Sequence, residues 1–209
     1  MTVAAFLRDQ LCEMGSRYDL FVAANAADGV FLDELGISAR FLRVPIERKI
    51  LPSADLRALI CLARHFLREQ FDIVQSVTPK AGLLAMAASF FARVPVRVHT
   101  FTGQVWATKS GVPRAGLRLL DTLIAGLATH VLVDSFSQRQ FLIENRVVSA
   151  HKSSVLGNGS ISGVDTRRFR ADPAARRALR EKSGIPAEDV VFVYVGRLNR
   201  DKGIPELVR

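Results

Sequence analysis

The chain has 209 residues, of which 49% are apolar, so it can bury a sizeable core and is not an intrinsically disordered protein. Its formal net charge of +9 comes from 29 basic and 20 acidic residues, and most of the basic residues are Arg. Such an excess suits nucleic acid, anionic lipid head groups or phosphorylated small molecules, and a solvated Arg-rich surface accounts for it equally well.

The cysteines and the apolar runs limit the class of protein further. Cys12 and Cys61 each lie in an apolar helical pattern, which predicts core thiols of a reducing compartment. No metal-ligand spacing involves them or the histidines, and no Asp-x-Asp pair occurs, so no carboxylate-held metal site and no cofactor are expected. The apolar run from Ala81 to Ala92 is too short to span a bilayer, and the N-terminal residues do not resemble a secretion signal. We therefore expect a cytoplasmic protein.

Helical and extended patterns alternate along the first three quarters of the chain. Helices are predicted near residues 6–14, 31–35, 51–70 (with Ser53 as a possible cap), 81–92, 113–127 and 138–145, and strands over 18–25, 38–45, 71–77, 94–101, 130–135 and 152–158. Several of the strands are near-continuous apolar runs, which indicates a parallel sheet that is covered on both faces. The fold class is therefore α/β, a doubly wound parallel sheet of the Rossmann type.

The alternation breaks after Leu156. Residues 157–189 are rich in Gly, Ser, Pro and charge, with one helix predicted over 173–182, and indicate a linker between domains. Residues 190–196 then predict the first strand of a second Rossmann-like unit, followed by the start of a helix. We predict a domain over 1–156, a linker over 157–189 and an incomplete second domain over 190–209. Because an α/β unit of this kind normally opens with a strand, the chain is expected to be truncated at both ends.

The last loop carries basic residues between a strand and a helix. Gly196 permits a sharp turn, Gly203 permits close approach of a ligand, and Pro205 suits the first turn of a helix. A helix N-terminus favours phosphate, and Arg197 and Lys202 add full positive charges beside it. The loop is either a diphosphate clamp or an exposed turn with solvated side chains.

Polar residues also follow the predicted strand over 94–101. Thr100, Thr102 and Gln104 put polar groups where the ligand crevice of a doubly wound sheet lies. His99 is a candidate general base or hydrogen-bond donor, or a histidine satisfied within the sheet. Trp106 is able to stack on a sugar ring or to pack in the core.

Two further loops follow strands in the same way. Lys80 stands at the start of a helix, where it either meets an anionic group or solvates the loop. Asn158, Gly159 and Gly163 tolerate left-handed backbone conformations that direct N–H groups toward a cleft, although such residues also serve simple turns.

Five segments together resemble glycosyltransferase family 4, whose members are retaining enzymes of the GT-B fold. VFVYVGRLNRDKGIPELV is similar to the opening of that family's nucleotide-sugar domain, and SVLGNGSISGVDTRRF is similar to its interdomain segment. Three further segments resemble parts of the family's acceptor-binding domain and follow one another in the same order as there: SVTPKAGLLAMAAS, VPVRVHTFTG and VLVDSFSQRQFL. The resemblance covers nearly the whole chain and is strongest to bacterial enzymes of capsule, O-antigen and exopolysaccharide synthesis.

The resemblance implies transfer of a sugar from a nucleotide-diphosphate donor to a polyprenyl-diphosphate-linked or saccharide acceptor, with retention at the anomeric carbon. Residues matching Arg197 and Lys202 neutralise the diphosphate leaving group in that family, so that no metal is required. The candidate acceptor and cleft residues are Lys80, His99, Thr102, Gly103, Asn158 and Gly159. Such an enzyme works at the cytoplasmic face of the inner membrane, and an Arg-rich surface suits contact with anionic lipid.

Two departures from the family pattern bear on this interpretation. The family often has His directly before the glycine that matches Gly103, whereas this chain has Thr102 there and His99 three residues earlier. Any carboxylates that hold the donor sugar would lie beyond Arg209. A non-catalytic remnant with an acceptor-binding or membrane-docking role is the alternative function. Nucleic-acid binding is not expected, because the arginines are spread over many helices and only 8% of residues are aromatic.

Overall fold

The computed structural model describes residues 3–47, 49, 51–196, 198 and 202–208. The chain divides into two compact units, Met1–Gly163 and Val164–Arg209. Arg197, one of the two predicted diphosphate-binding cations, lies outside the described residues.

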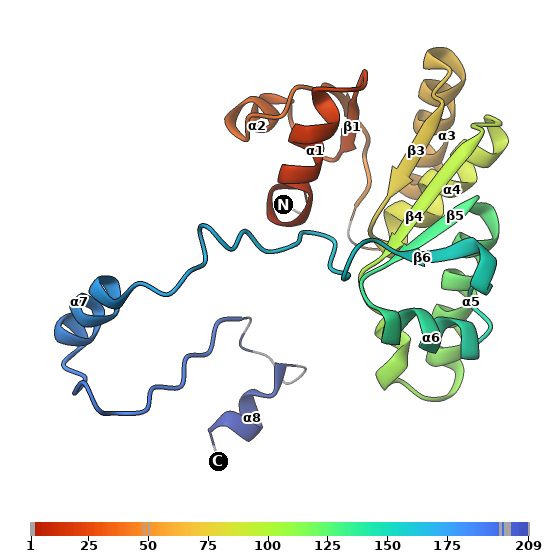
Figure 1. Ribbon diagram of the computed structural model, residues 1–209. Helices are drawn as coiled ribbons and strands as arrows, with labels where there is room; N and C mark the ends of the chain where they lie inside the picture. The colour runs from red at the N-terminus through yellow and green to blue at the C-terminus, as the bar shows by residue number, and fades with distance from the viewer. Residues whose placement is uncertain (1–2, 48, 50, 197, 199–201, 209) are drawn as a thin grey trace. The chain divides into compact units, whose positions relative to one another are not determined.

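The first unit contains all the strands found in the described residues, and every pairing is parallel (Figure 1). The strands are β1 (Phe21–Ala24), β2 (Arg40–Arg43), β3 (Ile73–Ser76), β4 (Val96–Phe101), β5 (His130–Val133) and β6 (Ser153–Val155). The helices are α1 (Arg8–Gly15), α2 (Val30–Glu34), α3 (Pro52–Glu69), α4 (Pro79–Phe91), α5 (Gly111–Leu127) and α6 (Phe136–Glu144). Short π or 3-10 turns cover Val3–Leu7, Val105–Thr108 and Ala150–Lys152. The predicted α/β class with parallel strands is confirmed.

The strands form two sheets instead of the single predicted sheet. β1 pairs with β2, and a separate sheet has the order β3-β4-β5-β6. The alternating sequence pattern identifies the strands, but it does not determine which strand edges share hydrogen bonds, because pairing depends on long-range contacts.

The core of the four-stranded sheet is apolar and well enclosed. Helix α4 packs between α3 and α5, and it has no charged residue after Lys80. This composition suits a helix that is covered on all sides. The largest side chains of the unit with almost no exposed surface are Trp106, Phe101, Leu32, Leu62, Met86, Ile124 and Leu142.

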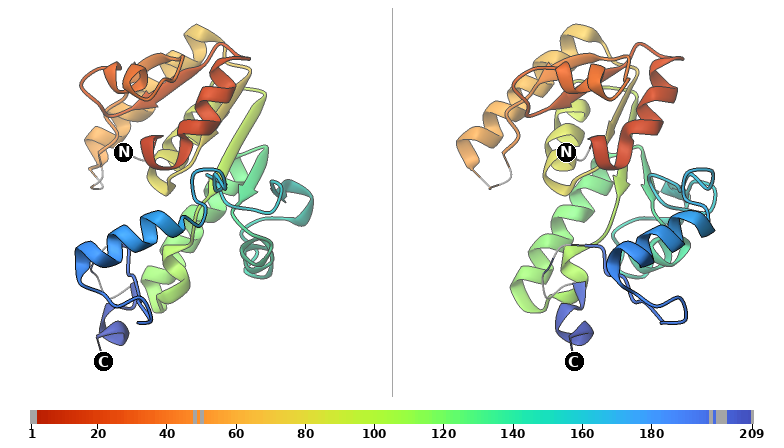
Figure 2. Two further views of the ribbon diagram at one scale, coloured as in Figure 1. Left: turned by 60° about the vertical axis from the view of Figure 1, so that its left-hand side comes forward. Right: turned by 90° about the vertical axis from the view of Figure 1, so that its left-hand side faces the viewer.

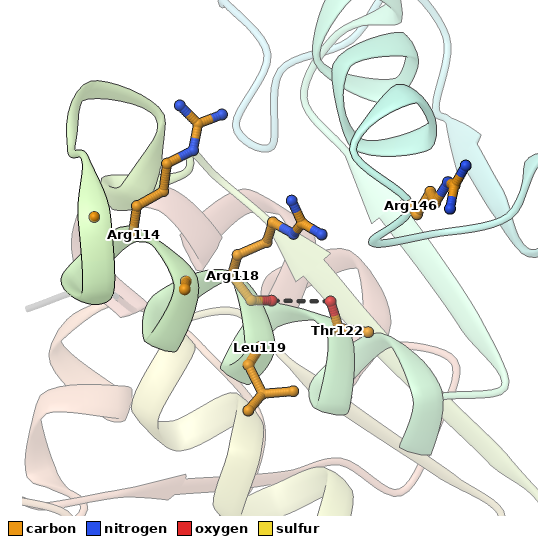
Figure 3. A pocket seen from close by; sticks show the side chains of 7 residues that line it. Arg114, Arg118, Leu119, Thr122 and Arg146 are labelled. Atoms are coloured by element: carbon orange, nitrogen blue, oxygen red, sulfur yellow. Dashed lines mark hydrogen bonds between the residues drawn. The ribbon is translucent and has the colours of Figure 1, made fainter.

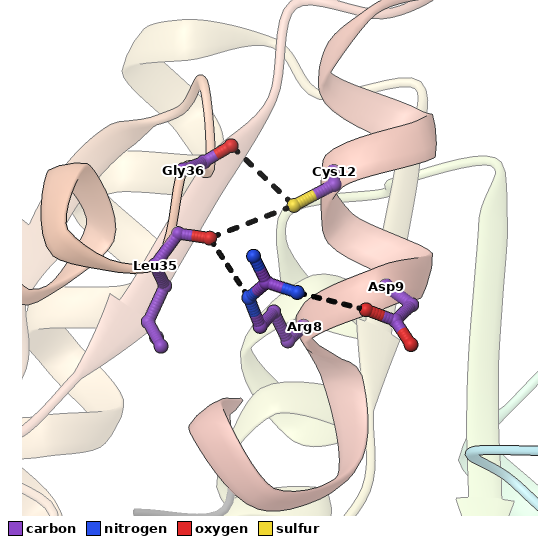
Figure 4. A network of polar contacts seen from close by, with 5 residues as sticks. All are labelled: Arg8, Asp9, Cys12, Leu35 and Gly36. Atoms are coloured by element: carbon purple, nitrogen blue, oxygen red, sulfur yellow. Dashed lines mark hydrogen bonds and ion pairs between the residues drawn. The ribbon is translucent and has the colours of Figure 1, made fainter. Parts of the chain in front are cut away.

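A smaller cluster supports the two-stranded sheet. Val22, Leu32 and Ile37 are buried there, with Leu11 and Cys12 of α1 packed against them. Figure 4 shows the polar contacts of this region: the Cys12 sulfur lies 3.4 Å from the Gly36 carbonyl oxygen, and Arg8 Nε donates to the Leu35 carbonyl at 3.0 Å. Cys12 and Cys61 are both free thiols that pack against core residues.

Helix α3 begins two residues earlier than a Ser53 cap requires. The N-cap residue is Leu51, whose side chain makes no capping hydrogen bond. The predicted role of Ser53 as the cap is therefore wrong. The Asp55 carboxylate instead accepts a hydrogen bond from the Leu51 backbone N–H at 3.2 Å. A first-turn carboxylate thus satisfies an N–H group at the start of the helix.

The second unit has little regular structure. Helix α7 (Pro173–Ser183), the long blue helix in Figure 2, is capped by the Asp172 carboxylate and ends at Gly184. The predicted strand over residues 190–196 does not form, and its side chains are mostly exposed, with Phe192 at 87% and Val195 at 91%. A strand requires a hydrogen-bonded neighbour, and the described residues of this unit provide none. The predicted helix start is present as α8 (Ile204–Leu207).

Candidate functional site

The candidate residues of the first unit follow adjacent strands of one sheet. The registers of β3, β4, β5 and β6 bring the carboxyl ends of these parallel strands to the same edge. The segments that follow these strands contain Lys80, Thr102, Gly103, Asn158 and Gly159. This is the edge where doubly wound sheets bind ligands.

Lys80 is occupied by contacts within the protein. Its ammonium group lies 2.6 Å from Asp55 Oδ1, and both side chains are mostly buried, at 23% and 18% exposed. It also donates to the carbonyl oxygen of Lys49. In this structure Lys80 therefore joins α4 to the start of α3, and its predicted contact with an anionic ligand stays a prediction.

His99 lies inside the sheet, with no exposed surface. Its Nδ1 is 2.8 Å from the Ser76 hydroxyl, and its ring meets Phe101 edge to face at 4.5 Å between centroids. Burial lowers the pKa of His99 from 6.5 to about 4, so the imidazole is neutral near pH 7. Among the described residues its Nε2 has no hydrogen-bond partner.

The loop after β4 is open and its conformation requires glycine. Thr102 and Gly103 are exposed. Gly103 has φ of +150°, and nothing lies within 4 Å of where a side chain would begin. Gln138 of α6 fixes the loop, because its Nε2 donates to the Phe101 carbonyl and to Gln104 Oε1, each at 3.2 Å.

Trp106 belongs to the core and not to the open loop. It is 1% exposed, and its Nε1 donates to Asp121 Oδ2 at 2.7 Å. Its ring stacks on Phe141 at 5.1 Å. Burial raises the pKa of Asp121, while the bond from Trp106 lowers it. Of the two interpretations of Trp106 from the sequence, the structure shows packing.

Gly159 packs against the end of β5. A side chain at Gly159 would begin 2.2 Å from the Asp134 carbonyl oxygen, and that oxygen accepts a hydrogen bond from Ser160 N at 2.7 Å. Asn158 beside it is exposed. Gly159 therefore allows the segment after β6 to approach β5 closely.

The sequence analysis did not identify two polar residues at this edge as site residues. Asp134 follows β5 directly; burial raises its carboxyl pKa, and a hydrogen bond from the Ile161 backbone lowers it. Gln138 accepts from Asp134 N at 2.7 Å as well as holding the loop after β4. Both belong to the segment VLVDSFSQRQFL, so the signal available was a carboxylate and an amide directly after a buried strand.

The remaining candidates lie in the second unit. Gly203 has φ of +74° and is the N-cap of α8, and Lys202 before it is exposed. Gly196 is exposed, and a side chain there would begin 2.8 Å from the Tyr194 hydroxyl. The clamp of Gly196, Arg197, Lys202 and Gly203 stays a prediction, since Arg197 is outside the described residues.

The described residues contain no group of three His, Cys, Asp or Glu side chains placed to hold a metal ion. In the same part of the chain, none of the helices combines the length and the apolar character that crossing a bilayer requires.

The parallel strands and the helices that alternate with them define an α/β domain of the Rossmann-like type. The family model described as "Glycosyl transferase 4-like domain" matches residues 2–159. The chain therefore belongs to the glycosyl transferase 4-like domain family, as its sequence resemblance predicted.

Named relatives agree with this assignment. The chain is 33% identical over 167 residues to "Capsular polysaccharide biosynthesis glycosyltransferase CapM" of Staphylococcus aureus, covering 79% of this chain and 43% of the relative. It is 32% identical over 174 residues to "UDP-Gal:alpha-D-GlcNAc-diphosphoundecaprenol alpha-1,3-galactosyltransferase" of Escherichia coli, covering 81% of this chain and 43% of the relative. The chain thus spans less than half the length of these relatives.

A solved structure shares the fold. Anabaena Alr3699/HepE, determined in complex with UDP and glucose, superposes with a TM-score of 0.59 at 18% identity, covering 88% of this chain and 47% of that chain. At this identity the likeness shows the architecture alone.

Proposed function

We propose that the chain supplies the acceptor side, the linker and the first donor-binding loop of a glycosyltransferase for surface polysaccharide synthesis. The observation that carries the proposal is the family match over residues 2–159, together with the open Gly103 loop and Gly159 at one edge of a parallel sheet. The name of the Escherichia coli relative supports a nucleotide sugar as donor and a lipid-linked acceptor, and the name of the Staphylococcus aureus relative supports a role in polysaccharide synthesis.

The reaction moves a sugar from a nucleotide diphosphate to a polyprenyl-diphosphate-linked or saccharide acceptor, with retention and without a metal. Negative charge develops on the departing diphosphate, and Arg197 and Lys202 would stabilise it there. The exposed loop at Thr102 and Gly103 would face the acceptor. His99 is neutral near pH 7 and has no exposed surface, so in this proposal it supports the end of β3 through its hydrogen bond with Ser76 and does not act as a charged group.

The test compares the 209-residue chain with a longer protein that carries the chain and a complete second domain. Both are incubated with labelled nucleotide sugars and a polyprenyl-diphosphate-linked acceptor. The longer protein is expected to transfer sugar with an unchanged anomeric configuration and to keep its rate in EDTA. If the longer protein transfers sugar from none of the donors, the proposed transferase activity is wrong and a non-catalytic acceptor-binding role is favoured. Inhibition by EDTA would show that the reaction requires a metal.

The cations are tested in the longer protein. Arg197→Ala and Lys202→Ala are each expected to lower kcat by roughly 100-fold or more, the usual loss when one fixed donor to a developing charge is removed. Lys182→Ala, which removes an exposed lysine of α7, is the matched control and is expected to leave kcat unchanged. Normal turnover of both site variants contradicts the clamp.

A further inference from the structure

One glutamine side chain spans the loop that follows β4. Gln138, near the start of α6, donates from Nε2 to the Phe101 carbonyl oxygen and to Gln104 Oε1, each at 3.2 Å. These two acceptors stand on either side of Thr102 and Gly103, which are exposed. A single amide group therefore holds both ends of the exposed part of the loop.

The orientation of this amide is fixed by a third hydrogen bond. Gln138 Oε1 accepts from the Asp134 backbone N–H at 2.7 Å, and a backbone N–H is able only to donate. The amide oxygen must therefore face Asp134, and the amide nitrogen must face the loop. The Gln138 backbone is held as well, because its N–H donates at 3.1 Å to the hydroxyl of Ser135, the N-cap of α6.

The loop residue Gln104 depends on this contact. Its Nε2 is buried and has no hydrogen-bond partner among the described residues, so within its side chain only the oxygen is held. A buried N–H group without a partner raises the free energy of the loop conformation. The Gln104 carbonyl oxygen in turn accepts from the Ala107 N–H at 3.1 Å, in the short turn Val105–Thr108. Loss of the bond from Gln138 is therefore expected to loosen both the loop and the turn after it.

Asp134 extends these contacts to the segment after β6. Its carbonyl oxygen accepts from the Ser160 N–H at 2.7 Å, and its carboxylate accepts a hydrogen bond from the Ile161 backbone. Residues 159–161 lie shortly before the end of the first unit. Gln138, Asp134 and the groups that they bond thus form one network, the Gln138 network, which joins the loop after β4 to the segment after β6.

We propose that Gln138 is a positioning residue of the transferase. It holds the loop Thr102–Gly103 in the conformation that receives the acceptor, and it couples this loop through Asp134 to residues 159–161. A loop that is ordered before the acceptor arrives reduces the entropy cost of binding. The role in acceptor binding rests on the proposed function, whereas the coupling between the two segments is a property of the first unit by itself.

A groove in the same unit offers a control outside the network. Figure 3 shows this groove, which Arg114 and Arg118 of α5 line together with Arg146 from the segment after α6. The hydroxyl of Thr122, another lining residue, donates to the Arg118 carbonyl oxygen at 2.9 Å. Among the described residues, no hydrogen bond of the Gln138 network reaches a residue of this groove. Thr122→Val therefore removes a hydrogen bond from the unit and leaves the network unchanged.

Amide hydrogen exchange of the 209-residue chain, followed by NMR, measures the coupling without any substrate. Gln138→Met keeps the length of the side chain and removes its hydrogen bonds. The amides of Ala107 and Ser160, on opposite sides of the network, are expected to exchange about tenfold faster, the net effect of roughly one or two lost hydrogen bonds. Thermal unfolding and far-UV circular dichroism verify that each variant folds.

The matched control is Gln140→Met in the same helix. Its side chain is exposed and donates to Glu144 of its own helix at 2.9 Å. Gln140→Met and Thr122→Val are each expected to change the exchange of Ala107 and Ser160 by less than about twofold, because neither residue belongs to the network.

A substitution at the far end of the network tests the coupling in the opposite direction. A side chain at Gly159 would begin 2.2 Å from the Asp134 carbonyl oxygen. Gly159→Ala is therefore expected to displace this carbonyl group and to make the Ala107 amide exchange about threefold faster or more, although position 159 is not bonded to the loop after β4.

Kinetics of the longer protein test the connection to the acceptor. Gln138→Met is expected to raise the KM for the acceptor about tenfold and to leave the KM for the nucleotide sugar within about twofold, because the loop faces the acceptor in the proposed function. A purely structural role would instead reduce the amount of active enzyme, which lowers kcat and changes neither KM. Gln140→Met is expected to leave all three parameters unchanged.

Three results would overturn the proposal: unchanged exchange of Ala107 and Ser160 in Gln138→Met, equal acceleration of the amides within β5, or an equal rise of both KM values. Equal acceleration in β5 would mean that the substitution lowers global stability. Exchange requires neither donor nor acceptor, so the two proposals are able to fail separately. Faster exchange without any sugar transfer rejects the proposed function and keeps the coupling, whereas transfer with unchanged exchange rejects the coupling alone.

Discussion

Gly82 and His99 are packed so closely that the helix residue must be glycine. A side chain at Gly82 would begin 2.4 Å from His99 Cε1, and the imidazole is enclosed on its other sides by β3 and Phe101. We predict that Gly82→Ala lowers the free energy of unfolding by about 1–3 kcal/mol, because the buried ring has little space to move.

The control for this substitution is Gly116→Ala in α5, where nothing lies within 4 Å of the added methyl group. It is expected to stabilise by about 0.5–1 kcal/mol, since alanine loses less backbone entropy in a helix. Urea unfolding of both variants measures the difference. An equal effect of the two alanines would mean that the His99 ring is not held in the position described.

Buried His99 makes stability depend on pH. Its pKa of about 4 in the folded protein lies below the ordinary 6.5, so between these values the unfolded chain binds the additional proton. The contribution of His99 to the free energy of unfolding is therefore fully present above pH 6.5. It is lost as the pH drops toward 4, and this loss amounts to roughly 3 kcal/mol. His99→Gln is expected to remove this part of the slope when urea unfolding is measured across the range. The same slope in both proteins would show that His99 is accessible to protons in the folded state.

At the scale of elements, Trp106 and Asp121 connect the turn Val105–Thr108 to α5. The hydrogen bond of 2.7 Å is buried, so removal of the donor leaves a buried carboxylate without its partner. We predict that Trp106→Phe costs about 1–3 kcal/mol beyond the loss of ring area. Adding Asp121→Leu is expected to recover part of the loss, because both polar groups are then gone. Thermal unfolding of the single and double variants measures this coupling, which would be absent if the two single losses simply added.

The sequence predicted most elements because their local patterns are strong. The apolar run of α4 and the amphipathic pattern of α3 each correspond to an observed helix, and the strands around β4 and β5 were expected where they occur. The predicted strand over residues 190–196 does not form for a different reason. Its residues have the right composition, but a strand needs a neighbour to pair with, and the described residues of this unit provide none. The split into two sheets is likewise a matter of long-range pairing.

The position of the candidate site followed from topology, and its side-chain contacts did not. That Thr102, Gly103 and Gly159 belong to one edge follows from the parallel strand pattern, which needs only the element order. That Lys80 pairs with Asp55, and that His99 faces Gly82 inside the domain, depends on contacts between segments far apart in the sequence. Polar residues near a strand end are therefore easy to locate and hard to assign from sequence alone.

At the scale of the whole molecule, the two units differ in how much apolar surface they bury. Both hydrophobic clusters lie within the first unit. Helix α7 contains no buried residue, and Val190, Phe192 and Val195 are more than four-fifths exposed. Because burial of apolar surface is the main source of stability, nearly all of it belongs to residues up to Gly163.

A chain that ends at Gly163 is therefore expected to keep the fold of the first unit. We predict that its melting temperature lies within about 4 °C of the 209-residue chain, which corresponds to a change of about 1 kcal/mol for a protein of this size. Trp106 is the only tryptophan of the chain and lies in the first unit, so its fluorescence reports unfolding of that unit in both proteins. Trypsin is expected to cut first at the exposed arginines of the second unit, such as Arg167 and Arg176, and to leave a resistant fragment of the first. A shortened chain with exposed, solvent-quenched tryptophan would instead mean that residues 164–209 hold the first unit together.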